Sequence, residues 1–155
     1  MMGAVLPLAE AVSLVEGWKK EGKTVVTTNG TFDLLHRGHI FLLEECRKQG
    51  DMLIVGVNSN ASVQRYKGPR RPIEDEKVRA QNVAKYADVV FIFEDDDPRA
   101  WLKKMKPDVH CNAATYGEDC IEAPVLREIG ARLYLVPIKK ELGSTTQITQ
   151  EQPSV

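Results

Sequence analysis

The sequence predicts an α/β domain in which helices cover both faces of an open, doubly wound parallel sheet of about five strands. Short apolar runs alternate along the chain with segments of helical periodicity. Residues 52–57, Met-Leu-Ile-Val-Gly-Val, are apolar without interruption, as is typical of strands buried on both faces. The 155 residues suit one domain, and no repeat or low-complexity segment divides them. Together these observations favour a single Rossmann-like domain over residues 1–155.

The expected elements alternate between helix and strand. Apolar residues recur at helical spacing from Leu8 to Trp18, and Gly22 is a stop signal, so the N-terminal helix falls within residues 1–22, over 8–20. The elements that follow are a strand at 23–28, a helix at 38–48, a strand at 52–57, a polar and basic loop at 58–72, a helix at 74–86, a strand at 88–93, a helix at 97–105, a strand at 108–111, a loop at 115–119, a helix ending at 129, a strand at 131–136 and a short helix beginning at 144. Residues 151–155 are expected to be a frayed tail.

Charge and composition exclude several classes of protein. The formal net charge is -1 and the pI is about 6.3, which gives no electrostatic case for binding nucleic acid or a membrane surface. Glu10 interrupts the N-terminal residues, which lack the basic start of a signal peptide, and no apolar run is long enough to span a bilayer. The three cysteines are widely spaced and form no disulfide or zinc pattern, and Cys46 is expected in the core. We therefore expect a reducing, cytoplasmic setting.

The most informative segment is 30–39, Gly-Thr-Phe-Asp-Leu-Leu-His-Arg-Gly-His, which follows the first long strand. His36 and His39 are three residues apart at the start of an expected helix, so both can face one way. Gly38 leaves room for a phosphate to approach the backbone. A strand, a turn and a helix N-terminus form an anion site, where two imidazoles can donate hydrogen bonds to a phosphate under attack. Taken alone the motif also suits an ordinary helix start, but its position indicates chemistry on a nucleotide phosphate.

A second motif, Ser144-Thr145-Thr146, opens the last expected helix after Gly143. Its hydroxyl and backbone N–H groups suit the outer phosphates of a triphosphate. An ordinary serine N-cap is the alternative. Its occurrence together with the two histidines in one domain favours phosphate binding.

Charged residues between the two motifs are further candidates. Lys67 suits a cation on a loop that closes over a phosphate, although a solvated charge cluster is the alternative. Arg79 is expected either to point back to the same phosphates or to be structural. Asp33 would orient a histidine, lie near a metal or cap the turn. His110 is expected to be structural, and residues 94–97, Glu-Asp-Asp-Asp, form a surface loop rather than a metal site.

With both motifs the chain resembles the cytidylyltransferase-like nucleotidyltransferases over about residues 14–148. One similar subfamily is the adenylyltransferase domain of bacterial ADP-heptose synthase, which shares the first helix and the segments at 28–30, 57–59, 67–68, 71–72 and 144–146. The other is glycerol-3-phosphate cytidylyltransferase, which shares 30–36 and the Ser-Thr-Thr. The resemblance implies transfer of a nucleotide from ATP or CTP to a small sugar phosphate or polyol phosphate, with Mg²⁺ on the triphosphate and release of pyrophosphate. D-glycero-β-D-manno-heptose 1-phosphate is the expected acceptor, and glycerol 3-phosphate is the alternative.

The resemblance also assigns roles to individual residues, and no serine or cysteine stands with a base to suggest a covalent intermediate. The reaction is therefore expected to be a direct displacement. The implied catalytic residues are His36, His39 and Lys67; the implied nucleotide-binding residues are Thr31, Phe32, Gly38, Arg79, Ser144, Thr145 and Thr146; Asp33 is expected to bind substrate, and no residue is expected to bind a metal directly.

One stretch departs from the ADP-heptose synthases, which carry Lys-Gly-Gly-Asp-Tyr after the fourth long strand. Here residues 112–116 are Asn-Ala-Ala-Thr-Tyr, so the lysine, both glycines and the aspartate are replaced and only the tyrosine remains. This difference leaves the choice of base open and motivates a second hypothesis, a nucleotide-binding protein that has lost turnover. A homodimer is also considered, because relatives of this family dimerise.

Overall fold

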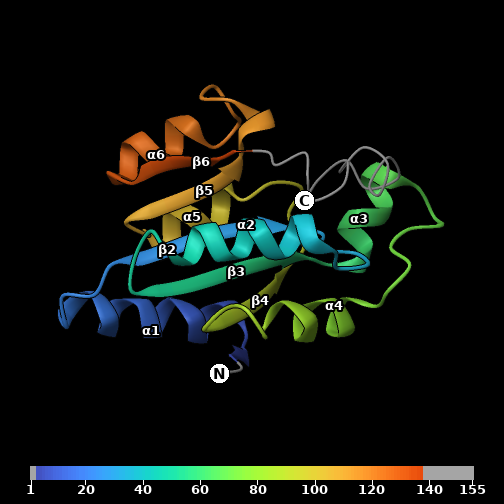
Figure 1. The fold of residues 1–155 in the computed structure, drawn as a ribbon, viewed down its shortest axis with the longest axis horizontal. Helices are drawn as coiled ribbons and strands as arrows, with labels where there is room; N and C mark the ends of the chain where they lie inside the picture. The colour runs from blue at the N-terminus through green and yellow to red at the C-terminus, as the bar shows by residue number, and fades with distance from the viewer. Residues whose placement is uncertain (1–2, 138–155) are drawn as a thin grey trace.

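The computed structural model describes residues 3–137, and residues 1–2 and 138–155 lie outside that range. The described strands form one sheet of six in the order β1-β4-β3-β2-β5-β6, and all neighbouring pairs are parallel (Figure 1). The strands are β1 (Ala4–Val5), β2 (Val25–Gly30), β3 (Met52–Asn58), β4 (Val89–Phe93), β5 (Val109–Ala113) and β6 (Arg132–Val136). The helices are α1 (Leu8–Lys20), α2 (Arg37–Arg47), α3 (Asn60–Lys67), α4 (Glu76–Val83), α5 (Arg99–Met105) and α6 (Ala123–Ile129), with a 3₁₀ turn η1 at Ala114–Tyr116.

Helices pack on both faces of this sheet, which confirms the doubly wound prediction. Successive residues of a strand point to opposite faces. In β3, Val55 belongs to the cluster formed with α2 and α4, whereas Ile54 belongs to the cluster formed with α1, α5 and α6. This two-sided burial explains why β3 is apolar throughout. Cys46 lies fully buried in the α2 cluster, as expected.

The order of the strands reverses at β2. From β2 the chain passes through α2 to β3 and then to β4 on one side, and it returns through α5 to place β5 on the other side. In the ladder between β2 and β5, Thr27 pairs with His110. The carboxyl ends of β2 and β5 therefore flank a topological switch point, where open α/β sheets bind their ligands.

Two expectations about the elements were wrong. The sheet has six strands rather than about five, because the two-residue β1 pairs Ala4 with Val89 and is too short to show periodicity. The expected loop at 58–72 contains α3. Ser59 caps this helix by accepting a hydrogen bond from the Ser62 N–H at 3.1 Å. The sequence did not predict the helix because polar residues dominate it and no apolar stripe runs along it.

The other boundaries agree within a few residues. The predicted strand at 23–28 is shifted to Val25–Gly30, and the predicted helix at 74–86 is shortened to Glu76–Val83. No helix within residues 3–137 is long and apolar enough to cross a membrane. The expected helix from Ser144 and the expected tail at 151–155 lie outside the described residues.

Candidate active site

The two histidines of the His-x-Gly-His segment begin α2, immediately beyond the carboxyl end of β2. His36 is the N-cap residue, with extended backbone (φ -129°), and its Nδ1 accepts a hydrogen bond from the Gly38 N–H at 3.0 Å. The His39 Nδ1 accepts one from the His36 N–H at 3.2 Å. This reciprocal pair is a capping box built from imidazoles. Histidines stand at the N-cap and N3 positions of α2, where serine and glutamate are common. The same two side chains therefore cap the helix and lie at its N-terminal end.

These two hydrogen bonds fix the tautomer of both neutral rings. A neutral imidazole whose Nδ1 accepts a hydrogen bond carries its proton on Nε2. Burial lowers the pKa of His36, and burial together with the nearby His36 and Lys67 lowers the pKa of His39 to about 3. Both rings are therefore neutral at pH 7. The two rings stack with centroids 3.8 Å apart and planes at 25°.

Several buried polar atoms at the ends of β2 and α3 and at the start of α2 lack a hydrogen-bond partner within residues 3–137. Within residues 3–137, no hydrogen bond is made by Asn29 Oδ1, His36 Nε2, His39 Nε2 or Lys67 Nζ, although all four atoms are buried. A buried polar group without a partner costs about 1–3 kcal/mol, and more when it is charged. Such groups are rare in native proteins. Three donors and one acceptor at one end of β2 and α3 therefore indicate the place of a polar ligand.

Lys67 supplies the positive charge at this site. It is the last residue of α3, and Gly68 follows with φ of 96°. Burial lowers the pKa of Lys67 to about 8, the carboxylate of Asp33 opposes this shift, and Arg71 and Arg79 add to it. At pH 7 the amine is thus largely protonated while remaining partly desolvated. An anion at Nζ would recover the electrostatic energy that this burial costs.

Phe32 and Thr31 are buried beneath the surface of the site, where they support His39 and α3 rather than lying open to a ligand. Phe32 is fully buried with φ of 53°, and its ring meets the His39 ring edge-on at 5.5 Å between centroids. Thr31 is also fully buried, and its Oγ1 lies 2.8 Å from the Tyr66 hydroxyl on α3. Their predicted contact with a nucleotide stays a prediction, whereas their support of His39 and α3 is visible in the structure.

Asp33 holds the basic loop against the histidine segment. Its carboxylate is buried and accepts hydrogen bonds from the N–H groups of Ile73 at 2.7 Å and Glu74 at 2.9 Å. In return, the Glu74 side chain accepts from the Leu34 N–H at 2.9 Å. These bonds close the loop that begins after Lys67. The structure thus gives Asp33 a positioning role, and its direct contact with substrate stays a prediction.

Arg79 is fully buried, and its guanidinium ties three segments together. It donates to the carbonyl oxygens of Thr31 and Asn58, each at 2.8 Å. It also donates to the Glu74 carbonyl and to Asn60 Oδ1, each at 2.9 Å. The carboxyl ends of β2 and β3 are joined in this way to α3 and α4. With these donors used inside the protein, the expected contact with phosphates stays a prediction and the structural alternative gains support.

Sequence reasoning missed a polar network at the end of β5. The Thr27 hydroxyl lies 2.8 Å from His110 Nδ1, and His110 Nε2 lies 3.3 Å from Glu122 Oε2. The Asn112 amide donates to the same Glu122 oxygen at 3.0 Å. All four residues are buried. The signal for this network was the pair His110 and Asn112, two polar residues on one face of an otherwise buried strand.

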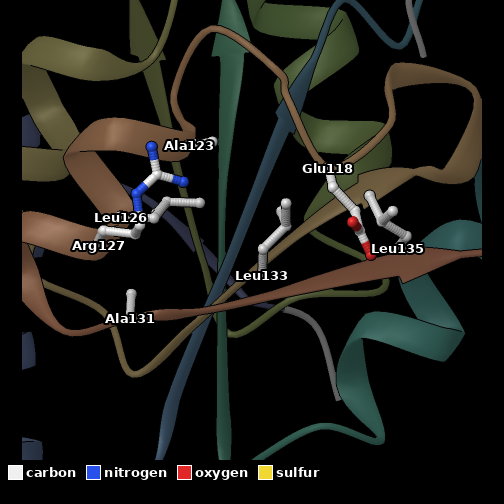
Figure 2. Close-up of a pocket in the computed structure, with 7 residues that line it drawn as sticks. All are labelled: Glu118, Ala123, Leu126, Arg127, Ala131, Leu133 and Leu135. Atoms are coloured by element: carbon white, nitrogen blue, oxygen red, sulfur yellow. The ribbon is translucent and has the colours of Figure 1, made fainter.

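A groove of mixed polar and apolar lining elsewhere on the molecule contains none of the predicted site residues. It lies between α6 and β6, with Leu133 at its centre and Arg127 and Glu118 toward opposite ends (Figure 2). Ser144, Thr145 and Thr146, the predicted triphosphate residues, lie outside the described residues. The candidate site is therefore the group around His36, His39 and Lys67.

The fold and this site define a class: a Rossmann-like α/β domain whose His-x-Gly-His segment starts the helix after the strand at the switch point. Within that class, the chain belongs to the cytidylyltransferase-like family, whose model matches residues 27–151.

Two curated relatives share the name Bifunctional protein HldE. The one from Gluconobacter oxydans is 38% identical over 155 residues, which cover 98% of this chain and 32% of that protein. The one from Mesorhizobium japonicum is 43% identical over 148 residues, which cover 94% of this chain and 30% of that protein. The chain thus spans about a third of the length of these relatives.

Solved structures agree with this family. A lipopolysaccharide core biosynthesis protein from Thermoplasma volcanium is 32% identical with a TM-score of 0.60, and the match covers 76% of this chain and 98% of that one. Pantothenate synthetase from Thermus thermophilus has a TM-score of 0.63 at 16% identity, over 96% of this chain and 67% of that one. The second likeness concerns the fold alone.

Proposed function

We propose that this domain transfers a nucleotide from a nucleoside triphosphate to a small sugar phosphate and releases pyrophosphate. The observation that carries the proposal is the pair of buried Nε2–H groups near Lys67, whose Nζ has no hydrogen-bond partner within residues 3–137. Membership of the cytidylyltransferase-like family supports the reaction type. The HldE relatives and the lipopolysaccharide core protein support a sugar phosphate as acceptor.

The proposed reaction is an in-line displacement. An oxygen of the acceptor phosphate attacks the α-phosphorus and forms a new P–O bond, while the bond from the α-phosphorus to the bridging oxygen breaks and its electron pair leaves with pyrophosphate. Negative charge spreads over the non-bridging oxygens of the α-phosphate. In our proposal His36 and His39 donate from Nε2 to these oxygens, and the capping box holds both rings before substrate arrives.

Lys67 would bring a cation to the same phosphates. Its Nζ is buried near the histidines, so its charge acts through less water than a surface lysine would. Asp33 and Arg79 do not act on the phosphates in this proposal. They hold the loop, β2 and α3 in place, so that Lys67 and the two imidazoles keep one arrangement.

Mg²⁺ enters the proposal on the triphosphate. Within residues 3–137 no three His, Cys, Asp or Glu side chains converge as a metal cage, and the Asp33 carboxylate already accepts two backbone N–H groups. This arrangement fits an ion that keeps its waters and is bound chiefly through phosphate oxygens. When bound, the ion would neutralise charge on the leaving pyrophosphate.

The specific acceptor we propose is D-glycero-β-D-manno-heptose 1-phosphate, with ATP as donor. The test is a pyrophosphate-release assay with Mg²⁺ in which ATP and CTP are each paired with the heptose phosphate and with glycerol 3-phosphate. Release is expected with ATP and the heptose phosphate and is expected to be absent when the acceptor is omitted. His39→Ala measures the background.

The other outcomes separate the alternatives. Release only with CTP and glycerol 3-phosphate would replace the proposed substrates and keep the reaction type. Binding of ATP or CTP in calorimetry without release in any pairing would favour a nucleotide-binding protein, the hypothesis that the altered stretch at residues 112–116 motivates.

A further inference from the structure

The network at the carboxyl end of β5 ends in a side chain that is held in one orientation. The Asn112 amide nitrogen donates to Glu122 Oε2 at 3.0 Å, and His110 Nε2 lies 3.3 Å from the same oxygen. Glu122 and Asn112 are 4% and 7% exposed. An amide whose NH₂ group is bound to a buried carboxylate offers its carbonyl oxygen to a ligand. With its NH₂ group bound to Glu122 and its side chain also in contact with Cys120, Asn112 has Oδ1 as its acceptor at the end of β5.

The carboxylate that holds this amide is charged. Burial alone would raise the pKa of Glu122, but hydrogen bonds from His110 and Cys120 lower it to about 2. The anion can only accept hydrogen bonds, so it excludes the flipped amide, which would place two oxygens against each other. Thr27 Oγ1, 2.8 Å from His110 Nδ1, completes the chain by anchoring the imidazole to β2.

A second amide oxygen lies at the matching position of β2. Thr27 pairs with His110, and one residue further the Thr28 hydroxyl donates to the Cys111 carbonyl at 2.8 Å. The next residues along the two strands are Asn29 and Asn112. Asn29 Oδ1 is buried and has no partner within the described part of the chain. Two amide oxygens thus belong to adjacent strands at the switch point, at positions that continue the register of Thr27 and His110.

We propose that Asn112, oriented by Glu122, is a specificity-determining residue that accepts a hydrogen bond from the exocyclic amino group of the nucleobase, with Asn29 as the second acceptor. This inference rests on the proposed function, because it places the base of the same triphosphate. An amino group has two hydrogens for two acceptors, whereas a carbonyl at that position would face oxygen on both sides. The site therefore selects adenine or cytosine over hypoxanthine or uracil.

The test compares nucleotides that differ in this one group. Calorimetry with Mg²⁺ and no acceptor measures Kd for ATP against ITP and for CTP against UTP. The wild type is expected to bind the amino-bearing member of its preferred pair about 10-fold or more tightly, as one matched hydrogen bond is worth. Leucine has a similar volume and no acceptor, so Asn112→Leu is expected to bring the ratio of the two Kd values close to one.

Two further variants separate orientation from simple loss of structure. Glu122→Gln frees the Asn112 amide to turn, and it is expected to abolish or reverse the ratio. The double variant N112D/E122Q exchanges amide and carboxylate and keeps an oxygen toward the base, so it is expected to restore the preference. Glu118→Gln, an exposed carboxylate nearby, is the matched control and should keep the wild-type ratio.

The outcomes are distinct. A wild-type ratio near one, or an unchanged ratio in both Asn112→Leu and Glu122→Gln, would overturn this inference while leaving the proposed function in place. No binding of any triphosphate to the wild type would overturn the proposed function and this inference with it. Restoration by the double variant would exclude general damage to the fold as the cause.

Discussion

The carboxyl ends of β2 and β5 lie on the two sides of one switch point, but they treat their buried polar groups differently. At β2 and the adjoining α3, the Nε2 groups of His36 and His39 and the Nζ of Lys67 have no hydrogen-bond partner within residues 3–137. At β5, His110 and Glu122 are paired with each other and with their neighbours. Both regions contain buried histidines, so histidine burial alone does not distinguish them.

In our proposal, this difference marks where the protein loses folding stability for the sake of ligand binding. Unpartnered donors destabilise the free protein and would be satisfied by an anionic ligand. A paired network contributes to stability and fixes the geometry of its members. Changes at the β2 end should therefore affect turnover more than folding, and changes at the β5 end should affect folding and base selection more than phosphate chemistry.

The largest expected effect is at the β2 end. His39→Ala removes one preorganised donor to the α-phosphate, and such a loss lowers turnover about 100- to 1,000-fold. Pyrophosphate release measures this effect, and circular dichroism with thermal melting measures the fold. The variant is expected to fold normally. Turnover close to that of the wild type would refute the role of His39 and remove the contrast between the two ends.

The second effect concerns the buried guanidinium of Arg79, which joins the ends of β2 and β3 to α3 and α4. Arg79→Met leaves carbonyl oxygens of Thr31, Asn58 and Glu74 without their donor and is expected to lower the free energy of unfolding by about 3 kcal/mol. Urea denaturation checks it. Arg65→Met is the matched control, because Arg65 pairs with Asp96 at the surface and such pairs contribute about 1 kcal/mol or less. Equal losses in both variants would mean that Arg79 is no more structural than a surface arginine.

The third prediction sharpens the description of the β5 end. The folded-state pKa of Glu122, about 2, lies below its ordinary value of 4.5, so the charged form stabilises the fold. This contribution is fully present above pH 4.5 and is lost as the pH falls toward 2. Glu122→Gln is expected to lower the free energy of unfolding by about 2 kcal/mol at pH 7, with the gap to the wild type narrowing below pH 4.5. A gap that is constant over this range would show that the charge of Glu122 is not what stabilises the network.

Much of the architecture could be predicted because it depends on apolar runs. The apolar sequence of β3 and the periodicity of α1 are local signals, and both elements form where expected. The missed helix α3 has few apolar residues, so the sequence carries no periodic signal for it. It is stabilised instead by the Ser59 cap and by contacts such as that of Tyr66 with Thr31. Its existence depends on partners that lie far away in the sequence.

The site could be predicted in part for the same reason. His36 and His39 are close in sequence and sit between two recognisable elements, so a motif identifies them. The roles of Asp33 and Arg79 depend on bonds across 40 to 48 positions, from Asp33 to Ile73 and from Arg79 to Thr31. The link from His110 to Glu122 required the fold of the loop between β5 and α6. Spacing in the sequence contains no information about which backbone group such a side chain meets.

The smallest expected effect is the pH dependence at the β2 end. The pKa of Lys67, about 8, means that its charge is present below pH 8 and is lost above it, so kcat/KM is expected to fall up to about 10-fold per pH unit above 8. Because the pKa values of His36 and His39 are both lowered, neither imidazole is expected to titrate near the ordinary histidine value of 6.5, and only the phosphate groups of the substrates titrate there. Lys67→Arg keeps its charge throughout this range and should remove the alkaline fall. An alkaline fall that persists in Lys67→Arg would show that a group other than Lys67 titrates at the site and that neutral imidazoles with a single cation do not describe it.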